Sequence, residues 1–338
     1  MAGPEISRRG VLVLGASVLV GRRAGASARP GVRNAHALVH DPVHRRLVLF
    51  GGADAEQVRG DTWLRDGGRW TSTGASGPGP RTFPAAAFDR RRGRLVLFGG
   101  NRVLFGKEPR QDTLLDDTWE WDGASWRRSA ASGPPARSES AACYDARRGR
   151  VVLFGGWCWV NGERKRLGDT WELDGARWER MSDSGPGGRS GVALAFDPGR
   201  GATVLVGGSA GRSPLADAWE WRGTAWEGPL EGPGARFNPA LAADARQGGL
   251  VCFGGWNGST RLADTRVRRG TRWEPVAADG GPSPRNHTAM TFDEAEGRVL
   301  LHGGHDGERV LGDLWSWDGA GWTRLEDAEP VPRVDNGH

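Results

Sequence analysis

Short runs of apolar residues recur along this chain, and each run ends at a pair of glycines. The first run, Leu47–Phe50, is too short for a helix and lies between arginine and glycine. Runs of this length between turn-forming residues are typical of buried strands. Their regular recurrence indicates a repeated unit rather than isolated strands. The glycine pairs begin at Gly51, Gly99, Gly155, Gly207, Gly254 and Gly303.

Two polar positions keep a constant distance from each glycine pair. An arginine precedes the pair by 18 residues, and an aspartate stands eight residues after that arginine. Two spacings that hold in six copies are not a matter of chance. The arginines are Arg33, Arg81, Arg137, Arg189, Arg236 and Arg285. The aspartates are Asp41, Asp89, Asp145, Asp197, Asp244 and Asp293.

The second half of each unit is marked by two tryptophans seven residues apart. In the fifth unit Arg266 replaces the first tryptophan, while Trp273 keeps the second. An aspartate stands two residues before the first position in every unit. Asp122-Gly123 and Asp318-Gly319 predict hairpin turns after it. The complete pairs are Trp63 and Trp70, Trp119 and Trp126, Trp171 and Trp178, Trp219 and Trp226, and Trp315 and Trp322.

Each unit therefore predicts four antiparallel strands. The first begins at the arginine, the second is the apolar run, and the third and fourth carry the tryptophans. Because a four-stranded sheet does not bury both of its faces alone, we expect the six sheets to stack around an axis. The units lie at residues 33–76, 81–132, 137–184, 189–231, 236–280 and 285–326, with a tail at 327–338.

A four-stranded unit of 47–56 residues with a glycine doublet and spaced aromatics resembles the kelch repeat, from residue 29 to about residue 326. The resemblance implies an all-β fold, a six-bladed kelch-type β-propeller. With Trp121, Trp221 and Trp317, which also lie on predicted third strands, fourteen of the 17 tryptophans occupy repeated positions on the third and fourth strands, where we expect them to pack between blades. The chain starts with a first strand and ends with a fourth, so no strand is shared between the termini. We expect residues 330–338 to lie over the junction of the last and first blades.

The first 28 residues have the order of a twin-arginine signal peptide. Arg8-Arg9 precedes an apolar run, Val11 to Val20, and Ala26-Ser27-Ala28 offers a cleavage site. The run is too short to span a bilayer. We therefore expect residues 29–338 to be a single propeller domain, exported to the periplasm or the extracellular space, monomeric and not an integral membrane protein. Without residues 1–28 the chain has 42 basic and 40 acidic residues, which gives no reason to expect a nucleic acid partner.

The three cysteines, Cys143, Cys158 and Cys252, predict no disulfide framework. Cys143 and Cys158 belong to one unit but to opposite ends of it, about 20 Å apart along the strand. A disulfide requires Cα atoms within roughly 7 Å.

Residues that repeat in all six units are explained by the scaffold, so residues that differ are functional candidates. The arginines, Arg137 and Arg285 among them, suit a carboxylate or phosphate ligand. The aspartates of the third strands recur with them, and structural ion pairs are an equally economical interpretation. The loops between second and third strands are longest in units 2 and 3, at Asn101–Asp116 and Trp157–Gly168. These loops share one face, where we expect the ligand.

One group of candidate ligand residues lies around units 2 and 3. Trp157, Trp159 and Trp256 are the tryptophans outside the repeated positions, and an exposed aromatic beside a polar groove suits a sugar or a partner protein. Alternatively, the longer loop folds its tryptophans inward as a small core of its own. Glu139 and Asn238 are polar candidates at one repeated position, two residues after the arginine of each unit. The other residues at that position are Ala35, Phe83, Gly191 and His287.

A second group lies at the junction of units 6 and 1. Histidines with a carboxylate suit zinc, iron or general acid–base catalysis, and a divalent metal is the one cofactor considered. The spacing matches no recognised metal motif, and neighbouring strand residues need not point the same way. His302 replaces a phenylalanine, and we expect it to be buried and hydrogen-bonded. The group comprises Asn34, His36, Asn286, His287, His305 and Asp306.

These features favour an extracytoplasmic binding module that recognises a glycan, peptide, small polar ligand or cell-envelope component through its blade 2 and 3 loops. The alternative is an enzyme acting on a small polar or acidic substrate, similar to a sugar mutarotase, an epimerase or a lyase. Its catalytic base would be Glu139, His36, His287 or His305. A protein that positions a partner enzyme is a third interpretation. A copper-radical oxidase similar to galactose oxidase is excluded, because that type needs two tyrosines and this chain has only Tyr144.

Overall fold

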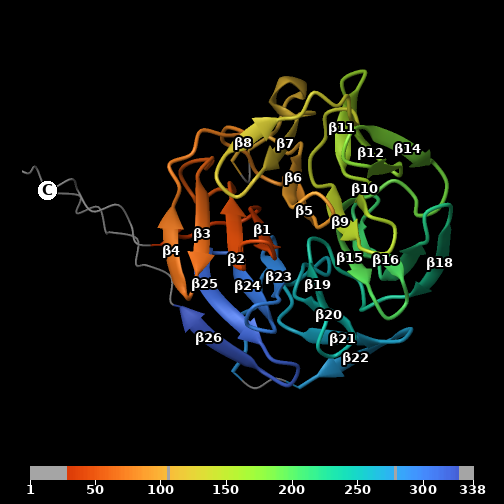
Figure 1. The fold of residues 1–338 in the computed structure, drawn as a ribbon. Helices are drawn as coiled ribbons and strands as arrows, with labels where there is room; N and C mark the ends of the chain where they lie inside the picture. Colours follow the sequence, from red (N-terminus) through yellow and green to blue (C-terminus); the bar gives the residue numbers. More distant parts are fainter. Residues whose placement is uncertain (1–28, 105–106, 278–279, 327–338) are drawn as a thin grey trace, which may run out of the picture.

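The structure is a computed structural model that describes residues 29–104, 107–277 and 280–326. Six four-stranded antiparallel sheets surround a central axis as a six-bladed β-propeller (Figure 1). The all-β, six-bladed prediction is therefore confirmed. The predicted signal peptide and the predicted position of the tail concern residues that lie outside the described ones.

The first three blades follow the predicted order of strands. Blade 1 consists of β1 Ala37–Asp41, β2 Arg46–Phe50, β3 Thr62–Asp66 and β4 Arg69–Ser72. Blade 2 consists of β5 Ala85–Asp89, β6 Arg94–Phe98, β7 Thr118–Trp121 and β8 Trp126–Arg128, with a 3-10 turn η1 Gln111–Thr113 in its long loop. Blade 3 consists of β9 Ala141–Asp145, β10 Arg150–Phe154, β13 Thr170–Leu173 and β14 Trp178–Ser182. Its long loop forms an additional hairpin, β11 Trp157–Val160 and β12 Glu163–Arg166.

The last three blades repeat the same arrangement. Blade 4 consists of β15 Ser190–Asp197, β16 Ala202–Ser209, β17 Asp217–Trp221 and β18 Trp226–Glu231. Blade 5 consists of β19 Ala240–Asp244, β20 Gly249–Phe253, β21 Thr265–Arg269 and β22 Arg272–Val276. Blade 6 consists of β23 Ala289–Asp293, β24 Arg298–His305, β25 Val310–Trp317 and β26 Trp322–Glu326.

The first strand of each blade lies innermost. The six inner strands contact one another around the axis, and β1 contacts β23 where the ring closes. Every blade is built from consecutive segments of the chain. Within the described residues, the first and last blades therefore share no strand.

The repeated arginines are buried structural residues. Arg33 donates through Nη1 to the carbonyl oxygen of Gly51 and to the Asp61 carboxylate, both at 3.0 Å. All six blades form this ion pair. The arginine thus ties the end of the second strand to the start of the third, which explains the constant spacing. It also stands before the first strand in every blade, so the prediction that this strand begins at the arginine is wrong. In blade 1 the strand begins four residues later, because the backbone turns at Ala35.

The repeated tryptophans join neighbouring blades, as predicted. Trp126 of blade 2 packs against Phe50 of blade 1, with ring centroids 5.2 Å apart. Its indole N–H donates to the hydroxyl oxygen of Thr62 at 2.8 Å. The aromatic contact buries apolar surface, and the hydrogen bond of the indole N–H fixes the orientation of the ring. Together they make this joint between blades specific as well as apolar.

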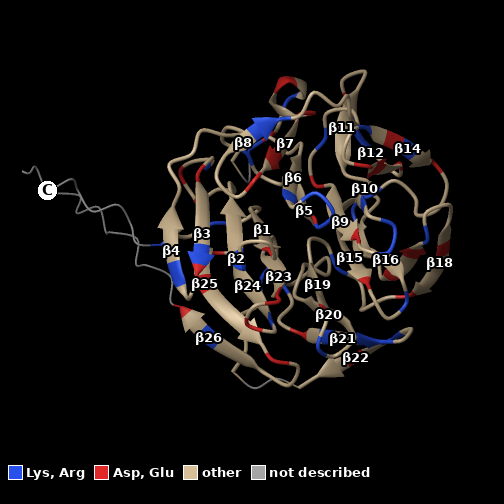
Figure 2. Ribbon diagram, viewed as in Figure 1, with Lys and Arg blue, Asp and Glu red and all other residues tan. Residues whose placement is uncertain are grey.

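Charged residues of both signs are interspersed over all six blades (Figure 2). The part of the chain that the structure describes contains no helix long and apolar enough to cross a lipid bilayer.

Candidate ligand pocket on the propeller axis

One position in each blade has a left-handed backbone: the residue two places after the repeated arginine. Its φ lies between 50° and 63°, a region that residues other than glycine rarely adopt. Five of the six residues are not glycine, so the conformation is imposed by the fold. We call the six residues the axial belt: Ala35, Phe83, Glu139, Gly191, Asn238 and His287.

Backbone hydrogen bonds join neighbouring belt residues around the axis. Five of the six belt N–H groups donate to the belt carbonyl of the preceding blade; Phe83 donates to Ala35 and Asn238 donates to Gly191, both at 2.8 Å. Gly191 donates to Glu139 and Ala35 to His287, both at 3.0 Å, and His287 donates to Asn238 at 3.4 Å. Because these bonds use only the backbone, the belt side chains are free to differ. Among the described residues, the sixth link, from Glu139 to Phe83, is not formed.

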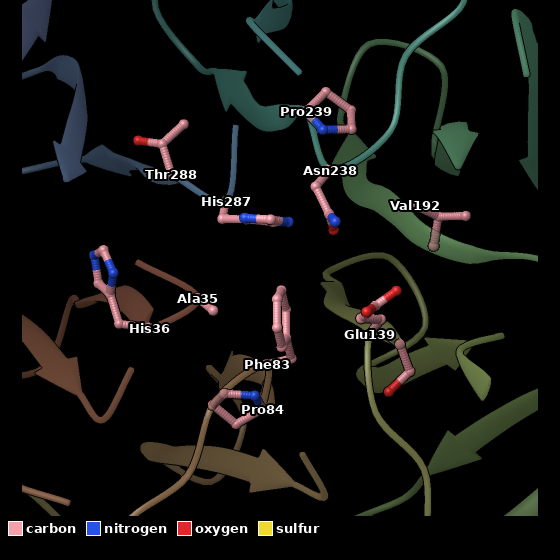
Figure 3. A pocket seen from close by; sticks show the side chains of 11 residues that line it. Ala35, His36, Phe83, Pro84, Glu139, Val192, Asn238, Pro239, His287 and Thr288 are labelled. Atoms are coloured by element: carbon pink, nitrogen blue, oxygen red, sulfur yellow. The ribbon is translucent and has the colours of Figure 1, made fainter. Parts of the chain in front are cut away.

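The belt lines a small pocket on the axis, with a volume of about 110 Å³. In Figure 3 the side chains of Phe83, Glu139, Asn238 and His287 converge on it from four blades. Blade 4 contributes no belt side chain, since a Cβ at Gly191 would lie 2.2 Å from Cε2 of Phe237. A cavity of about 150 Å³ holds benzene, so this pocket accommodates only a small group or the end of a side chain.

Glu139 is the one charged belt residue that lines the pocket. Its side chain is 12% exposed, and Oε1 lies 3.6 Å from Nη2 of Arg164 on β12. Burial raises the pKa of the Glu139 carboxyl, and the positive charge of Arg164 partly opposes that rise. Its Oε2 accepts no hydrogen bond of normal geometry, although the side chains of Ser190 and Trp157 act on the carboxyl and lower its pKa. A ligand or water that donates a hydrogen bond to Oε2 would therefore stabilise this site.

Asn238, Phe83 and His287 form the uncharged part of the pocket. The Asn238 amide nitrogen is buried without a hydrogen-bond partner. The Phe83 and His287 rings meet edge to face with centroids 5.1 Å apart. Burial lowers the pKa of His287 to about 3, so its ring is neutral near pH 7. The belt therefore offers the pocket one carboxyl, one amide and two rings, and His36, Ser140 and Thr288 also line it.

The blade 3 hairpin flanks the pocket, and it folds its own tryptophan inward. Trp157 is 1% exposed and packs with Leu114 and Cys158 in a small separate core. The Arg164 guanidinium covers the Trp157 ring at 3.8 Å from its centroid. This corrects our expectation of an exposed Trp157 and agrees with the alternative of an inward-folded loop. Trp159 and Trp256 are half-buried.

The histidines of the predicted group at blades 6 and 1 point in different directions. His36 and His302 are both buried, with 3.1 Å between Nε2 of His36 and Nδ1 of His302. His302 is thus a buried, hydrogen-bonded residue, as predicted. His287 lies against Phe83 instead, and His305 contacts Arg261 at 3.3 Å.

Asn286 and Asp306 have local structural partners. Asn286 accepts a hydrogen bond from Arg261, and Asp306 holds the turn that leads to Arg309. Asn34 is buried in the loop before β1, and its side-chain amide has no hydrogen-bond partner. Within the described residues no three histidine, cysteine or acidic side chains gather where they could hold a metal ion. The residues considered as candidate metal ligands are therefore dispersed.

Arg137 and Arg285 belong to the scaffold rather than to a ligand site. Arg137 donates to Asp169 at 2.7 Å and Arg285 to Asp313 at 2.6 Å, and both arginines are at most 1% exposed. The three cysteines are free, as predicted. Arg164 was missed from the sequence, because nothing in Glu163–Arg166 shows that the hairpin folds back towards Glu139. Gly191 and Asn238 in one slot were the available signal for a left-handed position.

No protein-family model matches the chain. The chain is 34% identical over 125 residues to dynein regulatory complex subunit 7 of Chlamydomonas reinhardtii, which covers 34% of this chain and 10% of that protein. It is 28% identical over 140 residues to Mei4-dependent protein 6 of Schizosaccharomyces pombe, which covers 38% of this chain and 20% of that protein. The chain thus matches a tenth to a fifth of the length of these relatives.

Proposed function

We propose that this chain is an exported kelch-type propeller that works as a binding module and takes a small polar group of its ligand into the axial pocket. The body of that ligand, a glycan or a peptide, extends over the loops of blades 2 and 3. The proposal extends our sequence-based expectation of these loops to the axis beside them.

The belt is the observation that carries the proposal. Its backbone is nearly the same in all six blades, so the hydrogen bonds between blades do not depend on the identity of the side chains, yet four of these side chains converge on one small pocket. The unmade link at Glu139, its Oε2 without a hydrogen bond of normal geometry, and the unpartnered amide nitrogen of Asn238 lie within that belt. Buried polar groups without partners are rare in folded proteins, and a ligand that pairs them gains the full benefit.

The enzyme alternative has weaker support. The raised pKa of Glu139 suits a proton-transfer group. An arginine without a partner opposite this carboxyl would favour a sugar mutarotase or epimerase. Arg164 instead contacts both Glu139 and the Trp157 ring. We therefore favour binding over catalysis.

Glycan and peptide arrays probed with residues 29–338 test the proposal. Glu139→Gln and Asn238→Ala are expected to lower the signal of every bound ligand at least tenfold, because each leaves a polar group of the ligand without its partner. The control is Arg177→Ala, which removes an exposed side chain from the turn between β13 and β14, outside the blade 2 and 3 loops, and is expected to change the signal less than twofold. Melting temperatures of all variants report whether the fold is retained.

Two results contradict the proposal. One is the absence of any bound array ligand, and the other is binding that Glu139→Gln and Asn238→Ala leave unchanged. If Arg177→Ala lowers the signal as strongly as the pocket variants do, the loss of binding does not report on the axial pocket.

A further inference from the structure

A second, larger cavity lies on the axis at the opposite face, among the turns that join first and second strands. Its volume is about 650 Å³, and residues of all six inner strands line it. The inner strands run along the axis, so this chamber and the belt pocket occupy successive lengths of the same channel. We call it the lower chamber. A volume between about 300 and 1,000 Å³ is typical of small-molecule sites.

Apolar side chains form most of the chamber wall. Val39, Phe196, Met290 and Phe292 line it and are only half-buried, so they keep apolar surface in contact with the cavity. Covering such surface contributes about 25 cal/mol per Å². Ala86 lines the same wall and is also half-buried, and it belongs to no apolar cluster between blades. The wall therefore favours an apolar occupant.

Arginines predominate in the turns at the lip of the chamber. The six turns between aspartate and second strand contain eight arginines and two glutamates, and Arg92, Arg148 and Arg200 form ion pairs with glutamates of their own blades. Arg90 and Glu294 line the chamber and form an ion pair with each other, so their charges offset one another. Arg246 also lines the chamber, is exposed, and donates to the Gly297 carbonyl oxygen at 3.4 Å. Within the described residues no carboxylate forms an ion pair with Arg246.

We infer that the lower chamber binds a small amphiphilic carboxylate, with its alkyl or aryl body inside and its carboxylate at Arg246. The wall supplies the apolar contact, and the guanidinium suits a planar carboxylate through two parallel N–H donors. Neither observation involves the belt pocket, so this site is independent of the function proposed above.

Calorimetric titration of residues 29–338 with sodium octanoate tests the inference. We expect saturable one-site binding, with acetate showing none because it has no apolar body to bury. Arg246→Gln is expected to weaken octanoate at least fivefold, and Ala86→Phe, which narrows the chamber and occupies part of its apolar wall, at least fivefold. The matched control is Arg147→Gln, which removes an exposed arginine of the same face that does not line the chamber. It is expected to change the affinity less than twofold, as is Glu139→Gln in the belt pocket.

Three results overturn the inference: no octanoate binding to the native chain, equal weakening by Arg147→Gln and Arg246→Gln, or unchanged affinity in Ala86→Phe. If Ala86→Phe fails to fold, Ala146→Trp replaces it. Ala146 lies exposed at the lip and lines the chamber, so a tryptophan there obstructs entry and is expected to weaken binding at least fivefold.

Discussion

The joint between blades 1 and 2 differs in chemistry from the joint that closes the ring between blades 6 and 1. At the first joint Phe50 packs on Trp126, and Thr62 accepts the indole hydrogen bond. At the closing joint His302 takes the place of the phenylalanine, and its ring lies 5.9 Å from that of Trp70. The same contact between neighbouring blades is therefore made by apolar side chains at the first joint and by titratable side chains at the closing joint.

The indole at the closing joint also has a different partner. Leu314 stands where four of the other five blades have threonine, and Trp70 donates to the Glu326 carboxylate at 2.9 Å. Glu326 accepts as well from Arg65 at 3.2 Å, and both side chains are largely buried. Since no strand is shared between the first and last blades, this polar contact and the His36–His302 pair take part in holding the ring closed.

The largest expected difference between the two joints is in their stability at low pH. Burial lowers the pKa of His302 to about 3, and burial together with His302 and Arg33 lowers the pKa of His36 well below its usual range. Arg33 and Arg285 lower the pKa of His302 further, while Asp313 opposes them. The unfolded chain takes up these protons below about pH 6.5, so stability is present above that pH and is lost as pH falls towards 3. We expect a loss of about 2–3 kcal/mol from His302 by pH 4.5, measured by urea unfolding.

The control for this prediction replaces the two histidines of the closing joint by the apolar residues found at another joint. The joint of blades 3 and 4 has Val192 and Phe154 at the positions of His36 and His302, packed in one apolar cluster. The double variant His36→Val/His302→Phe should unfold with a shallower pH dependence and be no less stable at pH 7. An unchanged slope would assign the acid sensitivity to the carboxylates that both proteins share.

Removing the hydroxyl at the ordinary joint should have a smaller effect. Thr62→Val keeps the shape of the side chain but leaves the buried Trp126 indole without its acceptor. The expected cost is about 1–2 kcal/mol in the free energy of unfolding. Thr71→Val, at an exposed position of the same blade, is the control and should change stability by less than about 0.5 kcal/mol. Equal effects of the two variants would mean that the indole hydrogen bond does not stabilise the joint.

The smallest effect is expected at the joint of blades 4 and 5, and it is a gain. Ala218 replaces the threonine there, and the Trp273 indole nitrogen is buried without a hydrogen-bond partner. Ala218→Thr should supply the acceptor and raise the free energy of unfolding by about 0.5–1 kcal/mol. Ala218→Val adds similar volume without the oxygen, so a gain in both variants would indicate cavity filling instead. Thermal or urea unfolding measures both.

The repeated residues made the scaffold predictable, because arginine, aspartate and tryptophan spacings are read directly along the chain. The same spacings misplaced the start of the first strand, since the left-handed turn at Ala35 has no signal in an alanine. In the pocket, Glu139 and Asn238 were identified because they differ between otherwise equal blades. Arg164 was not, because its approach to Glu139 depends on how a long loop folds in three dimensions.

The left-handed backbone of the belt restricts which amino acids can face the pocket and take part in recognition. Branching at Cβ crowds the backbone at positive φ, so valine, isoleucine and threonine fit poorly at these six places, and none of them occurs there. Asparagine and glycine tolerate the conformation best. A library that varies the belt over the remaining residues would change what the pocket recognises while the hydrogen bonds between blades stay the same.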